Sequence, residues 1–315
     1  MLTYTARITP LSAFGTLPKG DTLFGQLCWA LRNRHGEAWL AGLLDGYTAG
    51  RPFAVVSDAL PAGYLPRPSL PGHWFAPLSD GDRKAVKKRV WLPVEHFDEP
   101  VADWLRHCRA EAELPGGAPH SHPHPHNAID RRSGTTGKNF APYTLTRLWY
   151  AAQTELEIHI VLDDTRLTVA DLEQALRDIG ALGLGRDAGI GLGRFRVDAF
   201  GPAELPSQKG ANAWLTLAPC APQRLGWDAE HCFYKVFTRF GRHGDIGVHQ
   251  GNPFKTPVLL ADTGAVLTPR PETAIGAPFT GQGLGGDGSL SKAMAQTVHQ
   301  GYAPVLGIKL PTAGN

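Results

Sequence analysis

Two stretches of the chain repeat one pattern, in which a strand is followed by a helix and a second strand. In the first stretch, apolar side chains at Tyr4, Ala6 and Ile8 alternate with polar ones, which is typical of a half-buried strand. A helix is predicted from about Asp21, a residue type that favours the helix N-terminus, because apolar side chains then recur at helical spacing. Residues 52–56 predict the second strand.

The second stretch has the same order of elements. Residues 156–162 alternate apolar and polar side chains, and a helix is predicted from Thr168, with Asp171 three residues later, close to a capping box. Another strand is predicted through 195–197. Two β-α-β units in one domain are the ferredoxin-like pattern, so we predict an α+β fold with a ferredoxin-like (RRM-like) domain over 1–203.

A long insertion and a region of different character complete the chain. The insertion, at about 64–150, separates the two units and lacks a clean period. From about 204 short strand-like runs appear, and they lie at 214–217, 232–236, 258–260 and 302–310. We therefore predict a smaller β-rich domain over 204–315, with a hairpin around 262–264 and a flexible glycine-rich loop at 281–288.

Composition excludes only a few classes of function. The formal net charge is +2, which does not suggest a highly basic nucleic-acid binder, although 21 arginines against 10 lysines tilt weakly towards phosphate and base contacts. High-GC coding would produce the same bias. No apolar run approaches the length of a membrane helix and no signal peptide is visible, so a cytoplasmic protein is expected. The four cysteines form no C-x-x-C pair and predict reduced thiols.

The strongest local feature is a glycine-rich loop at 180–194, with six glycines and with Arg186 and Arg194 near its two ends. Glycines allow backbone amides to approach a phosphate or another backbone closely. The loop follows a helix and leads into a strand, the reverse of a nucleotide-binding loop, so no nucleotide cofactor is predicted. The alternative is a tight crossing between helix and strand without a ligand.

A second glycine-containing segment, 20–27, nearly matches a phosphate-binding loop but has Gln26 where lysine is required. We reject that match. Lys19 still lies beside a predicted helix N-terminus, where exposed amides favour an anion. An ordinary capped helix is the alternative.

The insertion carries three unusual segments. The cationic run 83–89 is either a solvated face or an RNA contact. The tract His120–His126 has a metal-site composition, but its prolines are expected to splay the imidazoles apart, so no metal site is predicted. Residues 127–138 are polar and cationic and run into the aromatic stretch 140–150, a mixture that suits single-stranded nucleic acid.

Nucleophile and metalloprotease motifs are absent from the sequence. Isolated histidines such as His35 or His249 could act as general acids, but nothing in the sequence distinguishes them from surface histidines. We therefore predict no catalytic residue.

Taken together, three segments resemble the RAMP superfamily of CRISPR effector proteins: 20–31, 185–195 and 251–258. The resemblance is closest to the fourth subunits of type III-A Csm complexes, in the Cas-five-like group. Residues 127–134 also resemble that family's insertion, and 301–305 its last strand. The matches follow one another in the right order along the whole chain.

The resemblance implies an assembly and RNA-binding subunit without catalytic residues, cofactor or metal of its own. It would hold the 5′ tag of the CRISPR RNA and join the large palm-domain subunit to the first backbone RAMP subunit. The C-terminal domain would be a degenerate ferredoxin-like one. The RNA-binding residues that we predict from motifs and resemblance together are Lys19, Asn127, Arg131, Arg132, Lys138, Gly185, Arg186, Gly189, Gly191, Gly193, Arg194 and Lys255.

Two other functions remain open at this point. One is a sister RAMP endoribonuclease that processes CRISPR repeat RNA; such enzymes carry their glycine-rich loop near the C-terminus, whereas about 120 residues follow Arg194 here. The other is a glycine-loop nucleotide-binding enzyme, which the order of helix, loop and strand disfavours.

Overall fold

The structure, a computed structural model, describes residues 1–78, 83–136, 141–223, 226–249, 251–270 and 277–311. Within these residues it is a mixed α and β fold whose sheets are antiparallel. No helix in this part of the chain is both long enough and apolar enough to cross a membrane. Of the predicted site residues, Lys138 lies outside the described ranges.

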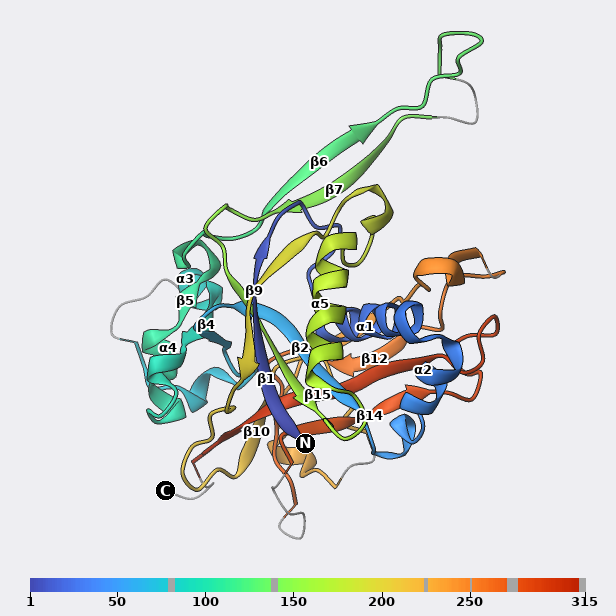
Figure 1. Cartoon of the computed structure of the whole chain (residues 1–315). Helices are drawn as coiled ribbons and strands as arrows, with labels where there is room; N and C mark the ends of the chain where they lie inside the picture. Colours follow the sequence, from blue (N-terminus) through green and yellow to red (C-terminus); the bar gives the residue numbers. More distant parts are fainter. Residues whose placement is uncertain (79–82, 137–140, 224–225, 250, 271–276, 312–315) are drawn as a thin grey trace.

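The first sheet is built from both predicted β-α-β units (Figure 1). Its strand order is β2-β8-β1-β9, and all neighbours are antiparallel. The bounds are β1 (Leu2–Pro10), β2 (Ala54–Pro61), β8 (Leu156–Leu162) and β9 (Phe195–Pro202). The helix of each unit, α1 (Gly20–His35) or α5 (Val169–Leu182), packs on this sheet and on the other helix. The two units therefore interleave their strands in one sheet rather than forming two separate ones.

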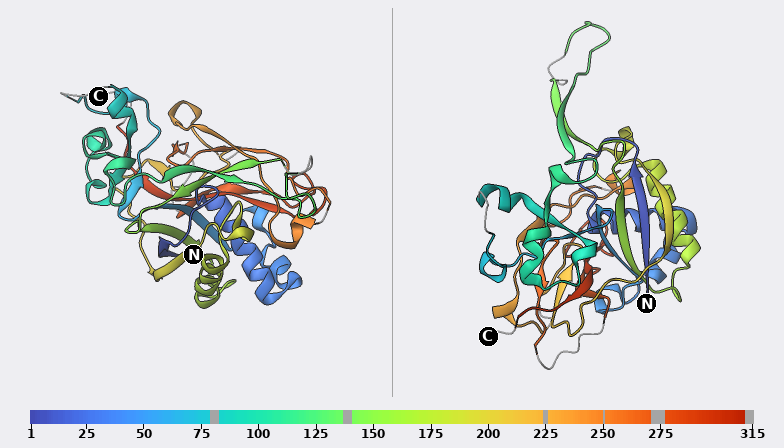
Figure 2. Two further views of the ribbon diagram at one scale, coloured as in Figure 1. Left: turned by 90° about the horizontal axis from the view of Figure 1, so that it is seen from above. Right: turned by 90° about the vertical axis from the view of Figure 1, so that its left-hand side faces the viewer.

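The periodicity that predicted these elements also decides which faces are buried. Tyr4, Ala6 and Ile8 of β1 are buried against apolar side chains of both helices in one core. Both helices lie on the same side of this sheet (Figure 2). The capping geometry predicted for α5 is present, because Thr168 Oγ1 accepts a hydrogen bond from the Asp171 amide at 3.1 Å. Strand alternation and helix periodicity are local signals, and the elements that they predicted are present in the structure.

The start of α1 differs from the prediction. Lys19, not Asp21, occupies the N-cap position, and its side chain makes no capping hydrogen bond. The carboxylate of Asp58, from β2, accepts a hydrogen bond from the Gly20 amide at 2.8 Å instead. Asp21 is turned into the interior, where Arg239 binds it. A partner distant in sequence thus took over the capping role that the local pattern assigned to Asp21.

The second sheet has the order β13-β10-β15-β14 and contains much of the region predicted to be β-rich. Its bounds are β10 (Ala213–Thr216), β13 (Val266–Leu267), β14 (Phe279–Gly285) and β15 (Val298–Ile308). The flexible loop predicted at 281–288 is wrong over its first half, because β14 pairs with β15 along its whole length. Gly283 is needed there for close approach, since a Cβ would lie 2.6 Å from the Tyr47 carbonyl oxygen.

The predicted hairpin around 262–264 is also wrong. The strand before it, β12 (Val258–Ala261), pairs with β11 (Val236–Arg239), whereas β13 after it pairs with β10. The turn therefore joins two sheets. Side chains of the turn bind outside it: Asp262 bonds Lys19, and Thr263 bonds Asp58. The strand predicted at 232–236 begins only at Val236.

The insertion forms a small subdomain and a projecting two-stranded arm (Figure 1). The subdomain contains β3 (Tyr64–Pro66), β4 (Arg89–Pro93), β5 (Arg109–Ala110), α3 (Arg83–Lys88) and α4 (Trp104–His107). The arm consists of β6 (His120–His126) and β7 (Tyr143–Trp149), which pair over their full length. The short helix α2 (Glu37–Leu43) follows α1.

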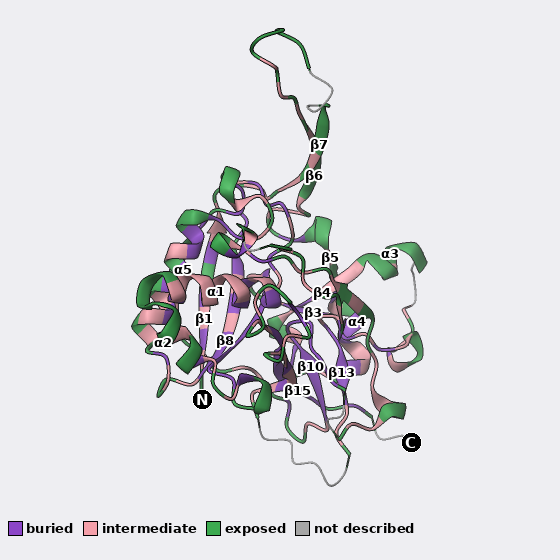
Figure 3. Ribbon diagram, turned by 90° about the vertical axis from the view of Figure 1, so that its right-hand side faces the viewer, coloured by how far each residue is buried: buried purple, intermediate pink, exposed green. Residues whose placement is uncertain are grey.

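Two cores link regions that the sequence separates (Figure 3). Tyr302 of β15 is buried in the core of the first sheet. Phe97 and Trp104 of the insertion are buried with Leu215 and Leu306 of the second sheet. The insertion thus packs on the C-terminal half of the chain, and the C-terminal half packs on the first sheet.

Candidate nucleic-acid interface

The glycine-rich loop connects α5 to β9, as predicted, and folds back on itself. The Leu184 amide bonds the Gly193 carbonyl at 3.0 Å, and the Gly193 amide bonds the Ala13 carbonyl at 2.7 Å. At Gly193, φ is +75° and a Cβ would collide with the Leu184 carbonyl. At Gly185 a Cβ would lie 2.7 Å from Thr16 Oγ1. These two glycines therefore serve the packing of backbone against backbone and side chain.

The outer part of the loop is built differently. A Cβ at Gly189 or Gly191 would meet no atom within 4 Å, and Ile190 between them is 59% exposed. Gly191 has a left-handed backbone, with φ +89° and ψ +13°. Arg194 is exposed at the end of the loop. The Ile190 and Gly191 amides donate to the Asp187 and Ala188 carbonyls inside the loop, so this segment exposes glycine backbone and one cation.

Arg186 joins the loop to the base of the arm. Its Nη2 donates a hydrogen bond to the Thr146 carbonyl of β7 at 3.0 Å, and its Nε lies 3.3 Å from Asp187. A backbone bridge between Phe14 and Leu148 holds the same strand against the segment that follows β1. The structure thus brings the loop and the arm base together, although the sequence separates them.

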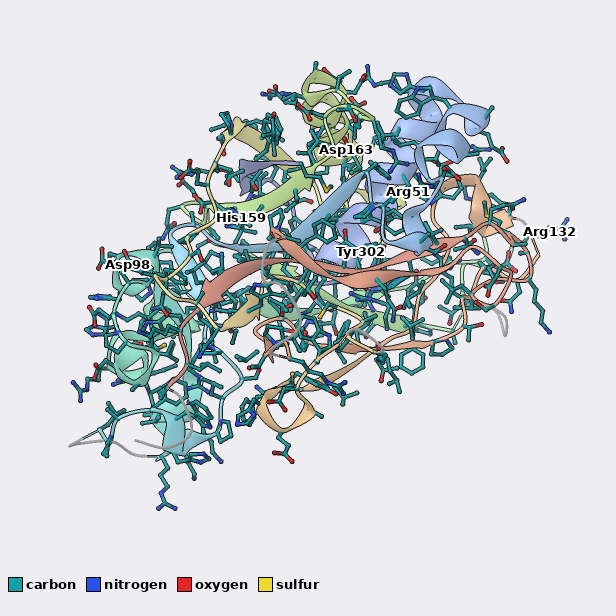
Figure 4. The ribbon with its side chains drawn as sticks, turned by 90° about the horizontal axis from the view of Figure 1, so that it is seen from below. Arg51, Asp98, Arg132, His159, Asp163 and Tyr302 are labelled. Carbon is teal, nitrogen blue, oxygen red and sulfur yellow. The ribbon has the colours of Figure 1, made fainter. Side chains whose placement is uncertain are left out.

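Three predicted RNA-binding residues of the insertion lie at the other end of the arm. Asn127, Arg131 and Arg132 are exposed beyond the paired strands. The Asp130 carboxylate accepts a hydrogen bond from the Arg132 amide at 2.9 Å and stabilises the turn. The tip stands clear of the body of the molecule (Figure 1). Seen from below, Arg132 lies at the edge of the molecule (Figure 4). Base and tip of the arm are therefore two separate parts of the candidate surface.

The prediction that the prolines splay the imidazoles of the arm apart is wrong. The histidines occupy alternate positions of β6 and so share one face of the strand. The ring centroids of His124 and His126 lie 4.9 Å apart, and His126 stacks on Tyr143 at 5.1 Å. The prolines keep the chain extended, but an extended chain brings every second side chain to the same side.

Lys19 lies where α1 meets the C-terminal half. Its Nζ is 2.7 Å from Asp262 Oδ1 and 3.2 Å from Asp58 Oδ2. Burial disfavours the ammonium, but the charges and hydrogen bonds of the two carboxylates outweigh it, so the pKa of Lys19 is raised. Two carboxylates within the chain thus already compensate this charge.

A second buried ion pair lies one residue beyond the helix start. The Asp21 side chain is 1% exposed and accepts two hydrogen bonds from the Arg239 guanidinium, one of them at 2.6 Å. His299 Nε2 lies 3.4 Å from Asp21 Oδ2. Lys255 belongs to the same surroundings: burial lowers its pKa, and the nearby Cys28 and Asp21 oppose that shift. Sequence reasoning missed Asp58, Arg239 and Asp262, because only the tertiary fold brings them to α1.

A cavity of about 500 Å³ opens beside Lys19, between the start of α1, the insertion and the segment after the arm. Tyr64 and Tyr150 contribute aromatic walls, and Lys19 and Asp58 polar groups. Thr154, also in the lining, has a buried hydroxyl without a hydrogen-bond partner among the described residues. Apolar walls with a few polar groups suit a flat, polar ring such as a nucleobase.

The two histidines considered as general acids lie in ordinary surroundings. His35 Nε2 is 3.1 Å from Asp171 Oδ1, and the ring stacks on Trp39 at 4.3 Å. His249 is exposed near the end of a 3-10 helix.

Comparisons with known proteins identify the fold. No family model and no curated protein matches the sequence. A chain of a solved Csm1–Csm4 cassette in complex with cA4 has a TM-score of 0.61 and 17% identity, over 99% of this chain and 100% of that one. A chain of a Csm1–Csm4 cassette in complex with pppApA has a TM-score of 0.59 and 16% identity, again over 99% of this chain and 100% of that one. A chain of a Csm3–Csm4 subcomplex from a type III-A interference complex has a TM-score of 0.52 and 13% identity, over 86% of this chain and 93% of that one.

These likenesses extend over almost the whole chain and over whole neighbour chains. The chain therefore has the fold of chains in type III-A CRISPR assemblies, with both halves and the insertion included. The resemblance found in the sequence is confirmed at the level of the fold.

Proposed function

We propose that this chain is a non-catalytic RNA-binding and assembly subunit of a type III-A CRISPR effector complex in the cytoplasm. It holds the 5′ tag of the CRISPR RNA and joins the large palm-domain subunit to the backbone RAMP subunits. The observation that carries the proposal is the likeness of the whole chain to chains of the Csm1–Csm4 cassettes and the Csm3–Csm4 subcomplex.

We further propose the domain division expected from the sequence: a ferredoxin-like RAMP domain over 1–203 and a degenerate ferredoxin-like domain over 204–315. The strand order β2-β8-β1-β9 supports the first domain, because two β-α-β units interleave in one antiparallel sheet. The second sheet supports the other domain, since its strands all come from beyond residue 204.

In this proposal RNA contacts the arm and the outer glycine-rich loop. Exposed arginines at the arm tip would pair with phosphates, and exposed Tyr143 and Trp149 would stack on bases. The open glycine backbone at Gly189 and Gly191, with Arg186 and Arg194 beside it, would allow close approach of the RNA backbone. Gly185 and Gly193 keep the loop in shape, while Lys19 would meet a base in the adjacent cavity. Lys255 would contribute positive charge from the C-terminal half.

Gly191→Asp is expected to weaken binding of single-stranded repeat RNA by about tenfold or more, because it adds a negative charge where phosphate is proposed. The space around this position is open, so the cost of the change is the backbone strain at φ +89°, which the control shares. Filter binding measures the affinity. Gly50→Asp is the matched control, since Gly50 has nearly the same backbone (φ +84°, ψ +11°) and equally open surroundings. Equal affinities of the two folded variants would exclude the loop from RNA binding.

A variant with alanine at Arg131, Arg132 and Lys138 is expected to bind RNA with a shallower salt dependence. Each lost phosphate contact reduces the log–log slope by about 0.7 for single strands, so the triple change predicts a loss of about 2. The affinity at several salt concentrations gives the slope. Alanine at Lys209, Lys292 and Lys309, three exposed lysines of the C-terminal half, removes equal charge away from the arm and serves as the control. An unchanged slope in the arm variant would mean that this segment contacts protein or solvent rather than RNA.

The proposed function itself is tested by co-purification. A tagged full-length chain, expressed with its own CRISPR locus, should retain a palm-domain subunit, backbone subunits and RNA that begins with the repeat-derived tag. The purified chain should not cut repeat or target RNA, with or without divalent metal. Specific cleavage that is lost in His35→Ala or His249→Ala would favour the RAMP endoribonuclease instead.

A further inference from the structure

A cluster of three side chains in the insertion is not used by the proposed function. Glu99 Oε1 lies 2.7 Å from His96 Nδ1, and Glu99 Oε2 lies 2.8 Å from His107 Nε2. The two imidazole rings stack with centroids 3.8 Å apart. Atoms able to ligate a metal, one from each residue, all lie within 4.8 Å of one another. Tetrahedral zinc separates its ligand atoms by about 3.4 Å, so small side-chain rotations would bring these atoms to ligating positions.

The backbone that carries these side chains is held by buried groups. Trp104, fully buried in the core beneath, donates from Nε1 to the Glu99 carbonyl at 2.9 Å. Gln208 donates to the same carbonyl at 2.8 Å and to that of Phe97 at 2.7 Å. His107 closes α4, whose Trp104 and Leu105 are buried. The three side chains therefore start from fixed positions, and assembling them around an ion costs little conformational entropy.

The surroundings of the cluster favour a cation. His96 directs Nδ1 at Glu99, while its Nε2 lies 3.5 Å from Glu95 Oε1, so a carboxylate faces the nitrogen that would remain free. Carboxylates in that position orient metal-bound imidazoles. Arg106, the nearest cation along the chain, is paired with Asp103 at 3.0 Å. The side chains of His96, Glu99 and His107 are 25%, 40% and 29% exposed, which gives an ion access from solvent.

We propose that His96, Glu99 and His107 form a site for a divalent transition metal of the zinc class. Two imidazoles and one carboxylate are ligands that zinc and its late first-row neighbours accept. They supply three of four tetrahedral positions and leave the fourth to water or to a group from another molecule. The bound ion would tie the turn at 94–99 to α4, the two segments of the insertion whose Phe97 and Trp104 pack in the core shared with the second sheet.

The proposal does not depend on RNA binding or on the assembly. The histidine tract of the arm drew attention in the sequence because of its composition, whereas here only His96 and Glu99 are close in sequence and His107 lies eight residues further on. Only the packing of the 94–99 turn against α4 brings positions 96, 99 and 107 together.

The test uses the full-length chain, stripped with a chelator and titrated with zinc alone against a chromophoric competitor. We expect one tight site per chain. His96→Gln with His107→Gln should weaken it by at least 100-fold, and Glu95→Gln by about tenfold. His122→Gln with His124→Gln removes two imidazoles from the arm and should leave the tight site unchanged.

Circular dichroism shows that each variant is folded before it is titrated, and the partial exposure of the changed side chains makes folding the expected result. Added zinc should also raise the melting temperature of the wild type and of the arm variant, but not that of the 96/107 variant. The proposal is wrong if the wild type has no tight site. It is equally wrong if the site persists in the 96/107 variant or disappears in the arm variant.

Discussion

Replacing Arg239 by methionine is expected to lower the free energy of unfolding by about 3–5 kcal/mol, because the change leaves the buried carboxylate of Asp21 without its partner. Burial opposes ionisation of Asp21. The hydrogen bonds and charge of Arg239 outweigh it, with help from His299 and the Thr22 amide, so the pKa of Asp21 lies below its ordinary value. Urea denaturation of the two proteins at neutral pH measures the difference.

Arg7→Met is the matched control, since Arg7 also pairs with a carboxylate, Glu157 at 2.9 Å, but its side chain is 48% exposed. That loss should stay within about 1 kcal/mol. Adding Asp21→Asn to Arg239→Met should recover part of the stability, because the buried site then holds no unpaired charge. Equal losses in the two single variants would contradict the assignment of Asp21 and Arg239 as a buried pair.

His299 is expected to make the chain less stable as the pH falls from 6.5 towards 4. Burial, with Lys255 and Arg239 nearby, lowers the pKa of His299 from 6.5 to about 4, although Asp21 opposes the shift. The unfolded chain therefore binds a proton at a higher pH than the folded chain. The stability contributed by neutral His299 is complete above pH 6.5 and is lost through this window, and it amounts to about 3 kcal/mol.

His299→Gln should flatten the dependence of unfolding free energy on pH between 6.5 and 4, which denaturant melts at half-unit steps would measure. His249→Gln replaces an exposed histidine and should keep the wild-type slope. Because Asp21 has a lowered pKa, its own contribution is lost below this window and does not obscure the comparison. Identical slopes in all three proteins would show that His299 is not buried in the neutral form.

Both predictions concern the contact between α1 and the C-terminal half. Asp21 lies in the first turn of α1, Arg239 at the end of β11 and His299 in β15. Together with the contacts of Lys19 with Asp58 and Asp262, they form the polar part of the junction between the two halves. A weakened junction would also disturb the cavity beside Lys19, so RNA binding of these variants is interpretable only after their stability is known.

The sequence predicted elements best where the signal was local. Alternation along β1 and β8 and the helical spacing in α5 depend on neighbours a few residues away, and these elements were predicted within a few residues. The flexible loop predicted at 281–288 was wrong because a glycine-rich composition was taken to indicate a flexible backbone. Its first half is a strand in which glycine permits close packing on Tyr47. The hairpin at 262–264 failed because the turn was recognisable but the pairing partners of its strands were not.

The candidate interface also has features that the sequence predicted and features that only the tertiary structure shows. The position of the glycine-rich loop between helix and strand followed from the sequence, but which glycines serve packing and which face outward did not. The Leu184 carbonyl leaves no room for a Cβ at Gly193, and Thr16 leaves none at Gly185. Gly189 and Gly191 have open space around them. The proximity of Arg186 to the arm base depended on a contact between residues 40 positions apart.

By itself, the sequence determined the two β-α-β units and the loop that follows α5, because strand and helix periods act over a few residues. Only the tertiary structure decided how the two units interleave, which sheet each C-terminal strand joins, and which charges are neutralised inside the chain. Lys19 illustrates the difference. Its place at the start of a helix was recognisable from its neighbours, but its two carboxylate partners come from β2 and from the turn after β12. Burial and pairing depend on groups that the chain brings together only when it folds, and these groups determine whether a charge is free to meet RNA.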